Sequence, residues 1–324
     1  MVNRPGRAYR KSYTEFYMNE TGKTYPRITI VVSCFNRAQF VGETIESVLN
    51  QGYPNLELII IDDGSTKDNS WEVIQSYKDR AFHVEHLPGY RSTHNIAINY
   101  GISLGTGEIM TTLNDKNLLL HKSLFTIAEI FTTFPDVEWV SGIGCIANRD
   151  GMITNLMPIR KDLHEHLIHV PWNIQHESTF WTRKLWERAG SHFREDSWSP
   201  DYDLWSRFFM HGAKLWHLNT ILGAYRKLPT AHGSSKAAEY YKYAAEARTM
   251  LRAATSKKEL VYAEVYKYLR YLKPLLRNIP DRVYAKIPFL NHYCHDSIKF
   301  LDVNKPTGYL VRYKRNPFRT IYPW

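Results

Sequence analysis

The segment Leu58-Ile59-Ile60-Ile61-Asp62-Asp63-Gly64-Ser65 decides the fold of this chain. Four apolar residues, three of them β-branched, run without interruption and end at two carboxylates, a glycine and a serine. Such a run, bounded by turn residues, is typical of a strand buried on both faces in a parallel sheet. Open α/β sheets bind ligands beyond the carboxyl ends of their strands. The segment therefore predicts a sheet rim at which acidic side chains meet a ligand.

The two acids also have a purely structural interpretation, because aspartate often caps the helix that follows a turn. Gly64 would supply the turn, and the next helix is expected to begin near Asp68. Asp68 is itself better placed for the cap than Asp62 or Asp63. We therefore expect at least one of the two rim acids to contact a ligand.

Strand and helix patterns alternate on both sides of this segment. Short apolar runs predict strands, and apolar residues at spacings of three and four predict helices. Asp150-Gly151 is typical of a hairpin turn, and Gly190 is placed to end a helix. The alternation predicts an α/β fold with a single Rossmann-like, mostly parallel sheet flanked by helices and a helical C-terminal extension. The expected strands are 28–33, 56–61, 82–87, 108–113, 138–142 and 215–225, and the expected helices are 41–49, 68–77, 93–104, 121–134, 182–189, the segment after 201, and 236–276, with short helices and loops over 277–324.

The bulk composition limits the class of protein. The 324 residues carry a formal net charge of +10, which favours an anionic partner such as a nucleotide, a phospholipid surface or nucleic acid. The 3 cysteines are far apart and form no CxxC, so neither a disulfide scaffold nor a structural zinc site is expected. Residues 1–23 are polar and basic, unlike a signal peptide, and no apolar run approaches the roughly 20 residues that span a bilayer. We expect a cytoplasmic protein, either in solution or peripheral at a membrane surface.

A series of motifs in a fixed order resembles one enzyme family. Residues 26–235 resemble a family 2 glycosyltransferase of the GT-A fold, which implies an inverting enzyme that uses a nucleotide-sugar donor. The chain lacks the GxGxxG pattern of dinucleotide-binding folds. On this resemblance 1–25 is an N-terminal extension, 26–235 the glycosyltransferase domain and 236–324 a helical, basic and aromatic C-terminal region. The matching motifs are Ile30-Val31-Val32-Ser33-Cys34-Phe35-Asn36-Arg37, Val48-Leu49-Asn50-Gln51, Ile61-Asp62-Asp63-Gly64-Ser65-Thr66 and Ala97-Ile98-Asn99-Tyr100-Gly101.

The resemblance also implies roles for single residues on the donor side. Asp63 would contact the nucleobase, with Ser33, Asn36 and Asp62 around the base and ribose. A UDP-sugar is the favoured donor, and the acceptor would be a hydroxyl of a glycan, lipid-linked or protein-linked molecule. The donor-binding residues implied by the resemblance are Ser33, Asn36, Arg37, Asp62, Asp63, Asn95, Asn114, Asp115, Lys116, Arg226 and His232.

The motif Leu113-Asn114-Asp115-Lys116-Asn117 departs from the family pattern. The family usually places two acids here to hold Mg²⁺ or Mn²⁺, which stabilises the charge that grows on the leaving diphosphate. Lys116 stands where the second acid normally is. Three outcomes are open: Asp115 binds the metal with Lys116 turned away, Lys116 itself partly neutralises the diphosphate, or the site is degenerate. Asp115 and His232 are the candidate metal ligands, and a requirement for a divalent cation is left open.

The acceptor side is implied by two further motifs. Ser199-Pro200-Asp201-Tyr202-Asp203-Leu204-Trp205 resembles the family segment that carries the general base, which makes Asp201 the catalytic residue and Asp203 the fallback. The alternative is that Asp201 only caps the helix. In Gln175-His176-Glu177-Ser178-Thr179-Phe180-Trp181, His176 and Glu177 would line the sugar site, although a lone histidine is often structural. Tyr225-Arg226 and His232-Gly233-Ser234-Ser235 would form a mobile lid, or else a linker.

The C-terminal region has two interpretations. Its tyrosines and basic residues suit an anionic membrane surface, where lipid-linked acceptors are found. The favoured alternative is a helical subdomain packed on the core. Two other functions compete with catalysis: a non-catalytic nucleotide-sugar-binding relative, motivated by Lys116, and a nucleic-acid-binding protein, motivated by the net charge. The chain has no recognisable base-reading module, so nucleic acid is not an expected partner. The tyrosines concerned are Tyr240, Tyr241, Tyr243, Tyr266, Tyr268 and Tyr271.

Overall fold

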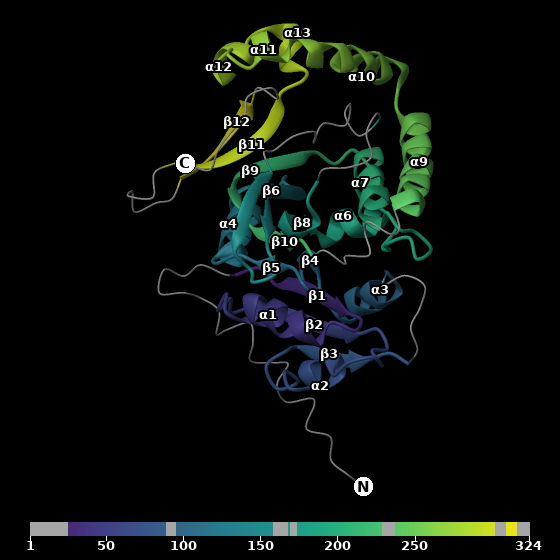
Figure 1. The fold of residues 1–324 in the computed structure, drawn as a ribbon. Helices are drawn as coiled ribbons and strands as arrows, with labels where there is room; N and C mark the ends of the chain where they lie inside the picture. Colours follow the sequence, from purple (N-terminus) through teal and green to yellow (C-terminus); the bar gives the residue numbers. More distant parts are fainter. Residues whose placement is uncertain are drawn as a thin grey trace.

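One large sheet organises the chain (Figure 1). The structure, a computed structural model, describes residues 25–88, 95–157, 168, 174–228, 237–301 and 309–315. Along the sheet the strand order is β12-β11-β9-β6-β8-β4-β1-β2-β3, with β5, β7 and β10 attached beside this path. The strands are β1 (Ile28–Cys34), β2 (Leu56–Asp62), β3 (His83–His86), β4 (Ile109–Asn114), β5 (Leu118–Leu119), β6 (Trp139–Ala147), β7 (Ile153–Met157), β8 (Thr179–Thr182), β9 (Leu215–Ile221), β10 (Gly223–Arg226), β11 (His295–Leu301) and β12 (Tyr309–Arg315).

The centre of the sheet confirms the expected α/β fold. Strands β4, β1, β2 and β3 are parallel neighbours, and every residue of β1 is buried. In β2 every residue after Leu56 is buried, as the uninterrupted apolar run predicted. The short strand β8 enters antiparallel between β4 and β6, so the sheet is mostly parallel rather than wholly so.

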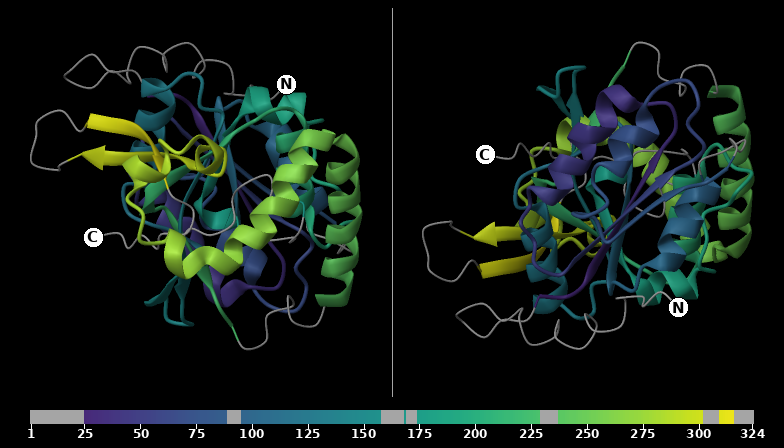
Figure 2. Two further views of the ribbon diagram at one scale, coloured as in Figure 1. Left: turned by 90° about the horizontal axis from the view of Figure 1, so that it is seen from above. Right: turned by 90° about the horizontal axis from the view of Figure 1, so that it is seen from below.

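Helices cover both faces of the sheet (Figure 2). One face packs against α1 (Ala38–Leu49), α2 (Ser70–Gln75) and α4 (Ser123–Thr133). The other packs against α3 (Asn95–Leu104), α6 (Arg183–Arg188), α7 (Pro200–Met210) and α9 (Ala237–Ala254). In α1 the residues Val41, Ile45 and Val48 recur at helical spacing and are fully buried, which explains why this amphipathic segment forms a helix on the sheet.

Two local predictions are refined by the structure. The hairpin at Asp150-Gly151 is confirmed, since β6 and β7 pair antiparallel and Gly151 has a φ of +81° that suits glycine. The expected strand over 215–225 is instead divided at Leu222 into β9, which pairs with β6, and β10, which pairs with both β5 and β6.

The C-terminal region is only partly helical. Helices α9, α10 (Lys257–Leu269), α11 (Lys273–Leu276), α12 (Asp281–Tyr284) and α13 (Pro288–Asn291) are present, with a 3₁₀ turn over Arg270–Leu272. The prediction of helices and loops to the end of the chain is wrong for β11 and β12, which pair antiparallel and extend the main sheet through β9. These strands form because of a tertiary contact. The outer edge of β9 has unpaired backbone groups, and β11 pairs with them, which buries Ile298 and its partner Leu218.

Candidate active site

The loops after β1, β2 and β4 meet at one edge of the sheet. The strands are parallel and in register, with Cα partners Cys34↔Asp62 and Ser33↔Asn114. Their carboxyl ends therefore lie side by side, as the rim argument predicted. Ser33 is buried within β1 next to this edge, and Asn114 ends β4.

The loop after β2 is held by internal hydrogen bonds. Asp62 is fully buried, and its carboxylate accepts hydrogen bonds from the Ser65 backbone N–H at 3.1 Å and from the Ser65 hydroxyl. The same carboxylate lies 2.6 Å from Nδ1 of His86. Gly64 adopts a φ of +79°, so the turn favours glycine. Asp62 thus uses its carboxylate to shape the loop.

Asn36 joins the first loop to the second. Its φ of +50° is one that asparagine tolerates better than most residues. Its Oδ1 accepts hydrogen bonds from the backbone N–H groups of Thr66 at 3.0 Å and Lys67 at 2.9 Å. These bonds fix the loop around Asp63, which is fully buried and whose N–H donates to the Cys34 carbonyl at 2.8 Å.

The N-cap positions of α1 and α2 are Arg37 and Asn69, but the side chain that serves both helix starts is that of Asp68. The Asp68 carboxylate accepts hydrogen bonds from the N–H of Ala38, the first residue of α1, at 3.0 Å and from the N–H of Ser70, the first residue of α2, at 3.1 Å. Because Asp68 serves both helices, a capping role accounts for neither Asp62 nor Asp63.

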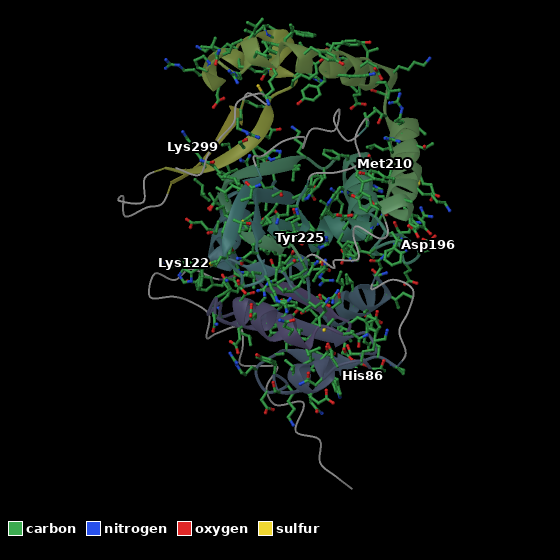
Figure 3. All side chains as sticks on the ribbon, in the orientation of Figure 1. His86, Lys122, Asp196, Met210, Tyr225 and Lys299 are labelled. Carbon is green, nitrogen blue, oxygen red and sulfur yellow. The ribbon has the colours of Figure 1, made fainter. Side chains whose placement is uncertain are left out.

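Asp115 and Lys116 follow β4 and face different neighbours. The Asp115 carboxylate accepts a hydrogen bond from the Phe35 N–H at 3.2 Å. Burial raises the pKa of Asp115 to about 6, against the lowering effects of that hydrogen bond and of the charges of Arg37 and Lys116. The Lys116 ammonium lies 4.8 Å from the ring centroid of Tyr225 and 3.4 Å from its hydroxyl. Figure 3 shows Tyr225 near the centre of the molecule.

The surroundings of Asp115 disfavour a divalent cation, because the cationic side chains of Arg37 and Lys116 lie nearby. Mg²⁺ prefers oxygen ligands and is usually held by one or two carboxylates together with substrate phosphates. Among the residues that the structure describes, no group of three or more His, Cys, Asp or Glu side chains could hold a metal ion. Asp115 offers one carboxylate with the cations Arg37 and Lys116 nearby. His232, the other predicted ligand, lies outside the described residues.

On the predicted acceptor side, Asp201 lies in the first turn of α7. The N-cap position is Ser199, and Pro200 opens the helix, where its missing N–H costs no hydrogen bond. Asp201 is therefore inside the helix rather than at its cap, and its Oδ1 accepts a hydrogen bond from the Tyr202 N–H at 2.8 Å. Burial raises the pKa of Asp201.

Glu177 lies close enough to Asp201 to feel its charge. Burial raises the pKa of Glu177, and the negative charge of Asp201 adds to the effect. The Asn117 side chain donates a hydrogen bond to the Glu177 carboxylate, and its Oδ1 accepts one from the Arg226 N–H at 3.1 Å. Asn117 thus connects the loop after β4 to the segment that carries Glu177. The sequence interpretation missed this link, since asparagine in a loop carries no signal of its partner.

Several predicted site residues use their polar groups inside the protein. The Asn95 amide donates to the carbonyls of Arg194 at 3.0 Å and Ser197 at 2.7 Å. Asp203 forms an ion pair with Arg207 at 2.9 Å. These contacts fix the segment before α7 and the helix itself.

His176 and Arg226 are likewise engaged. The His176 ring contacts the Thr112 hydroxyl through Nε2 and stacks on Phe193 at 6.0 Å, within a group of aromatic rings. The Arg226 side chain is 0% exposed, and its guanidinium pairs with Glu43 and donates to the Arg149 carbonyl at 2.9 Å. In this arrangement Arg226 supports the end of β10 from within.

The family model described as "Glycosyl transferase family 2" matches residues 29–188, which span β1 to the end of α6. This part of the chain belongs to glycosyltransferase family 2. The segment contains the whole rim after β1, β2 and β4 together with Glu177, while Asp201 lies just beyond it.

Known family 2 relatives match parts of the chain. Glycosyltransferase GlyG of Streptococcus pneumoniae is 32% identical over 105 residues, which is 31% of this chain and 33% of GlyG. Poly-β-1,6-N-acetyl-D-glucosamine synthase of Staphylococcus epidermidis is 31% identical over 133 residues, 41% of this chain and 32% of the synthase. GalNAc(5)-diNAcBac-PP-undecaprenol β-1,3-glucosyltransferase of Campylobacter jejuni is 29% identical over 106 residues, 32% of this chain and 34% of that enzyme. The matches span about a third of each of these relatives.

The GT-A fold of the family 2 segment is also seen in solved structures. S. aureus TarS 1-349 in complex with UDP-GlcNAc superposes with a TM-score of 0.57 at 14% identity, covering 80% of this chain and 83% of TarS 1-349. The same protein in complex with UDP superposes with a TM-score of 0.51 at 15% identity, covering 82% of this chain and 86% of TarS 1-349. The fold predicted from the sequence is therefore confirmed.

Proposed function

We propose that this chain is an inverting glycosyltransferase that moves a sugar from a nucleotide-sugar donor, with a UDP-sugar favoured, to a hydroxyl of its acceptor. One observation carries the proposal: the loops after three parallel strands bring Asp63, Asp115 and Lys116 to one edge of the sheet, and Glu177, before β8, lies near Asp201 of α7. The membership of residues 29–188 in family 2 and the UDP-GlcNAc complex of TarS support the same activity.

The nucleotide end of the donor is assigned to the loops after β1 and β2. A carboxylate is a hydrogen-bond acceptor that suits a base N–H or the ribose hydroxyls. Asp63 is the acid that the family resemblance assigns to the nucleobase, and Asp62 shapes the loop through Ser65 and His86. Asn36 and Asp62 hold the loop around Asp63 in place, and Ser33 and Asn114 lie along the same rim.

Lys116 takes the part that a divalent cation plays in relatives. A leaving diphosphate gains negative charge, and a fixed cation lowers the barrier by stabilising it. Lys116 carries a compact point charge, and the ring of Tyr225 orients it. Arg37 adds a second positive group at the same end, next to Asp115. On this proposal the enzyme does not depend on Mg²⁺ or Mn²⁺.

Asp201 acts as the general base. Its carboxylate takes the proton of the acceptor hydroxyl as that oxygen attacks the anomeric carbon from the side opposite the diphosphate. The C–O bond to the diphosphate breaks as the new glycosidic bond forms, so the configuration inverts. Glu177 lines the acceptor side, held by Asn117.

The acceptor is a glycan hydroxyl, either free or on a lipid carrier. The names of two relatives support this class: the Campylobacter jejuni enzyme is a glucosyltransferase acting on an undecaprenol-linked glycan, and the Staphylococcus epidermidis enzyme is a polysaccharide synthase.

A donor screen tests the proposal. The full chain is incubated with UDP-, GDP- and dTDP-sugars, and transfer, donor hydrolysis and the shift in Tm are measured with and without EDTA. We expect a Tm increase with UDP and turnover that persists in EDTA. Asp201→Asn should remove most of kcat while keeping the UDP shift, whereas Asp196→Asn, an exposed acid in the preceding loop, should leave kcat unchanged. Binding without transfer or hydrolysis would instead favour a non-catalytic nucleotide-sugar-binding protein.

The metal question needs its own variants. Lys116→Met should lower kcat, and added Mn²⁺ should not restore it. Lys116→Asp recreates a pair of acids and should show activity that depends on Mn²⁺. If EDTA abolishes wild-type activity and Mn²⁺ restores it, Lys116 does not replace the metal.

A further inference from the structure

A nearly continuous helical run forms one end of the molecule, opposite β3 and α2 (Figure 1). It consists of α10, the 3₁₀ turn over Arg270–Leu272 and α11. Its inner side is a small core in which Tyr266 and Leu269 pack with Tyr284, Leu290 and Tyr293. The predicted packing role of C-terminal tyrosines therefore applies to Tyr266.

The outer side of the same run is also apolar. Val261, Tyr268, Leu272 and Leu275 follow one another at spacings of seven, four and three, which places them on one face of a helix. Their exposed fractions are 64%, 64%, 47% and 71%, and neighbouring Tyr271 is 77% exposed. We call this surface, formed by Val261, Tyr268, Tyr271, Leu272 and Leu275, the outer face. Val283, Ile287 and Phe289, of α12, α13 and the turn between them, are exposed as well. Exposed apolar side chains gathered in this way mark an interaction surface.

The charge of this segment identifies the partner. Residues 267–287 contain six basic side chains and one acid, Asp281, for a net charge of +5. A second copy of the chain would bring the same positive charge against it, which disfavours self-association through this face. Apolar and tyrosine side chains flanked by cations are the composition of helices that lie in a membrane interface. The basic residues are Lys267, Arg270, Lys273, Arg277, Arg282 and Lys286.

We propose that the outer face binds the surface of an anionic lipid bilayer. Tyr268, Tyr271 and Leu275 enter the boundary between headgroups and acyl chains, and Lys273 and Arg277 contact lipid phosphates. No helix in the described part of the chain has the length and apolarity to cross a bilayer. The proposal does not depend on catalysis, and it would bring the enzyme to acceptors carried on lipid.

Vesicle sedimentation tests this proposal with the full chain. Vesicles of phosphatidylcholine alone are compared with vesicles that also contain phosphatidylglycerol, at low and high salt. We expect binding to the anionic vesicles that weakens with salt. Tyr271→Ser combined with Leu275→Ser should weaken it by about tenfold or more, because two apolar side chains no longer leave water. Met152→Ser, which removes an apolar side chain that is 63% exposed just before β7, is the control.

The outcomes separate lipid from protein partners. Because Tyr271 and Leu275 are exposed, the double variant should keep the wild-type Tm, which shows that lost binding is not lost folding. Lys273→Glu with Arg277→Glu should reduce binding to anionic vesicles only. The proposal fails if wild type does not sediment with anionic vesicles, or if the double variant binds as tightly as wild type. It also fails if size-exclusion chromatography shows a dimer that the double variant dissociates, since a second copy would then occupy the face.

Discussion

Asn99 of α3 should be a strong determinant of both stability and turnover. Its side chain forms a matched pair of hydrogen bonds with the backbone of Phe193, donating to the carbonyl at 2.8 Å and accepting from the N–H at 2.7 Å. Phe193 is fully buried, so its backbone groups depend on this partner. The segment that Asn99 holds leads within a few residues into α7 and Asp201.

The size of the effect follows from these contacts. Asn99→Ala removes two hydrogen bonds, each with a net value of about 1 kcal/mol, and leaves two buried backbone groups whose loss of partners adds about 1 kcal/mol or more. We expect the free energy of unfolding to fall by about 2–4 kcal/mol. Asn95 keeps its own bonds to Arg194 and Ser197, so the fold should survive.

Urea unfolding and kinetics measure the two consequences. The Asn99→Ala midpoint should shift with an unchanged m-value, and kcat should fall while the UDP-induced Tm shift remains, because Asp63 is held by a different loop. Ser103→Ala is the control: it lies on the same helix, is exposed, and should stay within about 0.5 kcal/mol of wild type. If Asn99→Ala is as stable as Ser103→Ala, the pairing with Phe193 does not fix this segment.

Strand packing, the general base and a surface ion pair each offer a further test. Gly223→Ala should cost about 1–3 kcal/mol in thermal melts, because a Cβ would lie 2.1 Å from the Glu177 carbonyl oxygen; an unchanged Tm would contradict this. Burial raises the pKa of Asp201 and only the carboxylate accepts a proton, so kcat should rise with pH through a value above 3.8. The residual kcat of Asp201→Asn should not rise with pH in this way. If the same rise remains in this variant, another residue is the general base. Asp136→Asn breaks the exposed pair with Arg312 and should change urea unfolding by about 0–1 kcal/mol; a larger loss would show that β12 relies on it.

The helices and strands that could be predicted are those whose buried residues follow a regular local spacing in the sequence. The apolar runs of β1 and β2 and the spacing of Val41, Ile45 and Val48 each report burial without knowledge of the partner. The sequence did not predict β11 and β12, because their pairing depends on the edge offered by β9, far away in the chain. A basic stretch with alternating apolar residues is ambiguous until that edge exists.

The site was predictable at the level of the rim and less so at the level of single side chains. Register alone brings Asp62 and Asn114 to the strand ends that flank β1, which follows from parallel pairing. Contacts with Ser65 and His86 make Asp62, rather than Asp63, the acid that shapes the loop. An ion pair with Glu43 fixes the position of Arg226. No short-range sequence pattern could indicate either set of contacts. Tyr225 was expected only in a lid, and its contact with Lys116 emerged from the fold.

The charge balance of the rim explains how a lysine can occupy a position that is usually acidic. Two carboxylates with one divalent cation sum to zero charge, and so do one carboxylate, Asp115, and one ammonium, Lys116. A diphosphate would therefore meet the same net charge in both arrangements. In this chain the positive charge is the ammonium of Lys116, which is part of the protein and is oriented by the ring of Tyr225. Adding a divalent cation would bring Asp115, Lys116 and the metal to a net charge of +2, and Arg37 would raise it to +3, a repulsion that the low dielectric of a buried site strengthens. If Lys116 replaces the metal, as proposed, the Lys116→Asp variant should exchange one for the other.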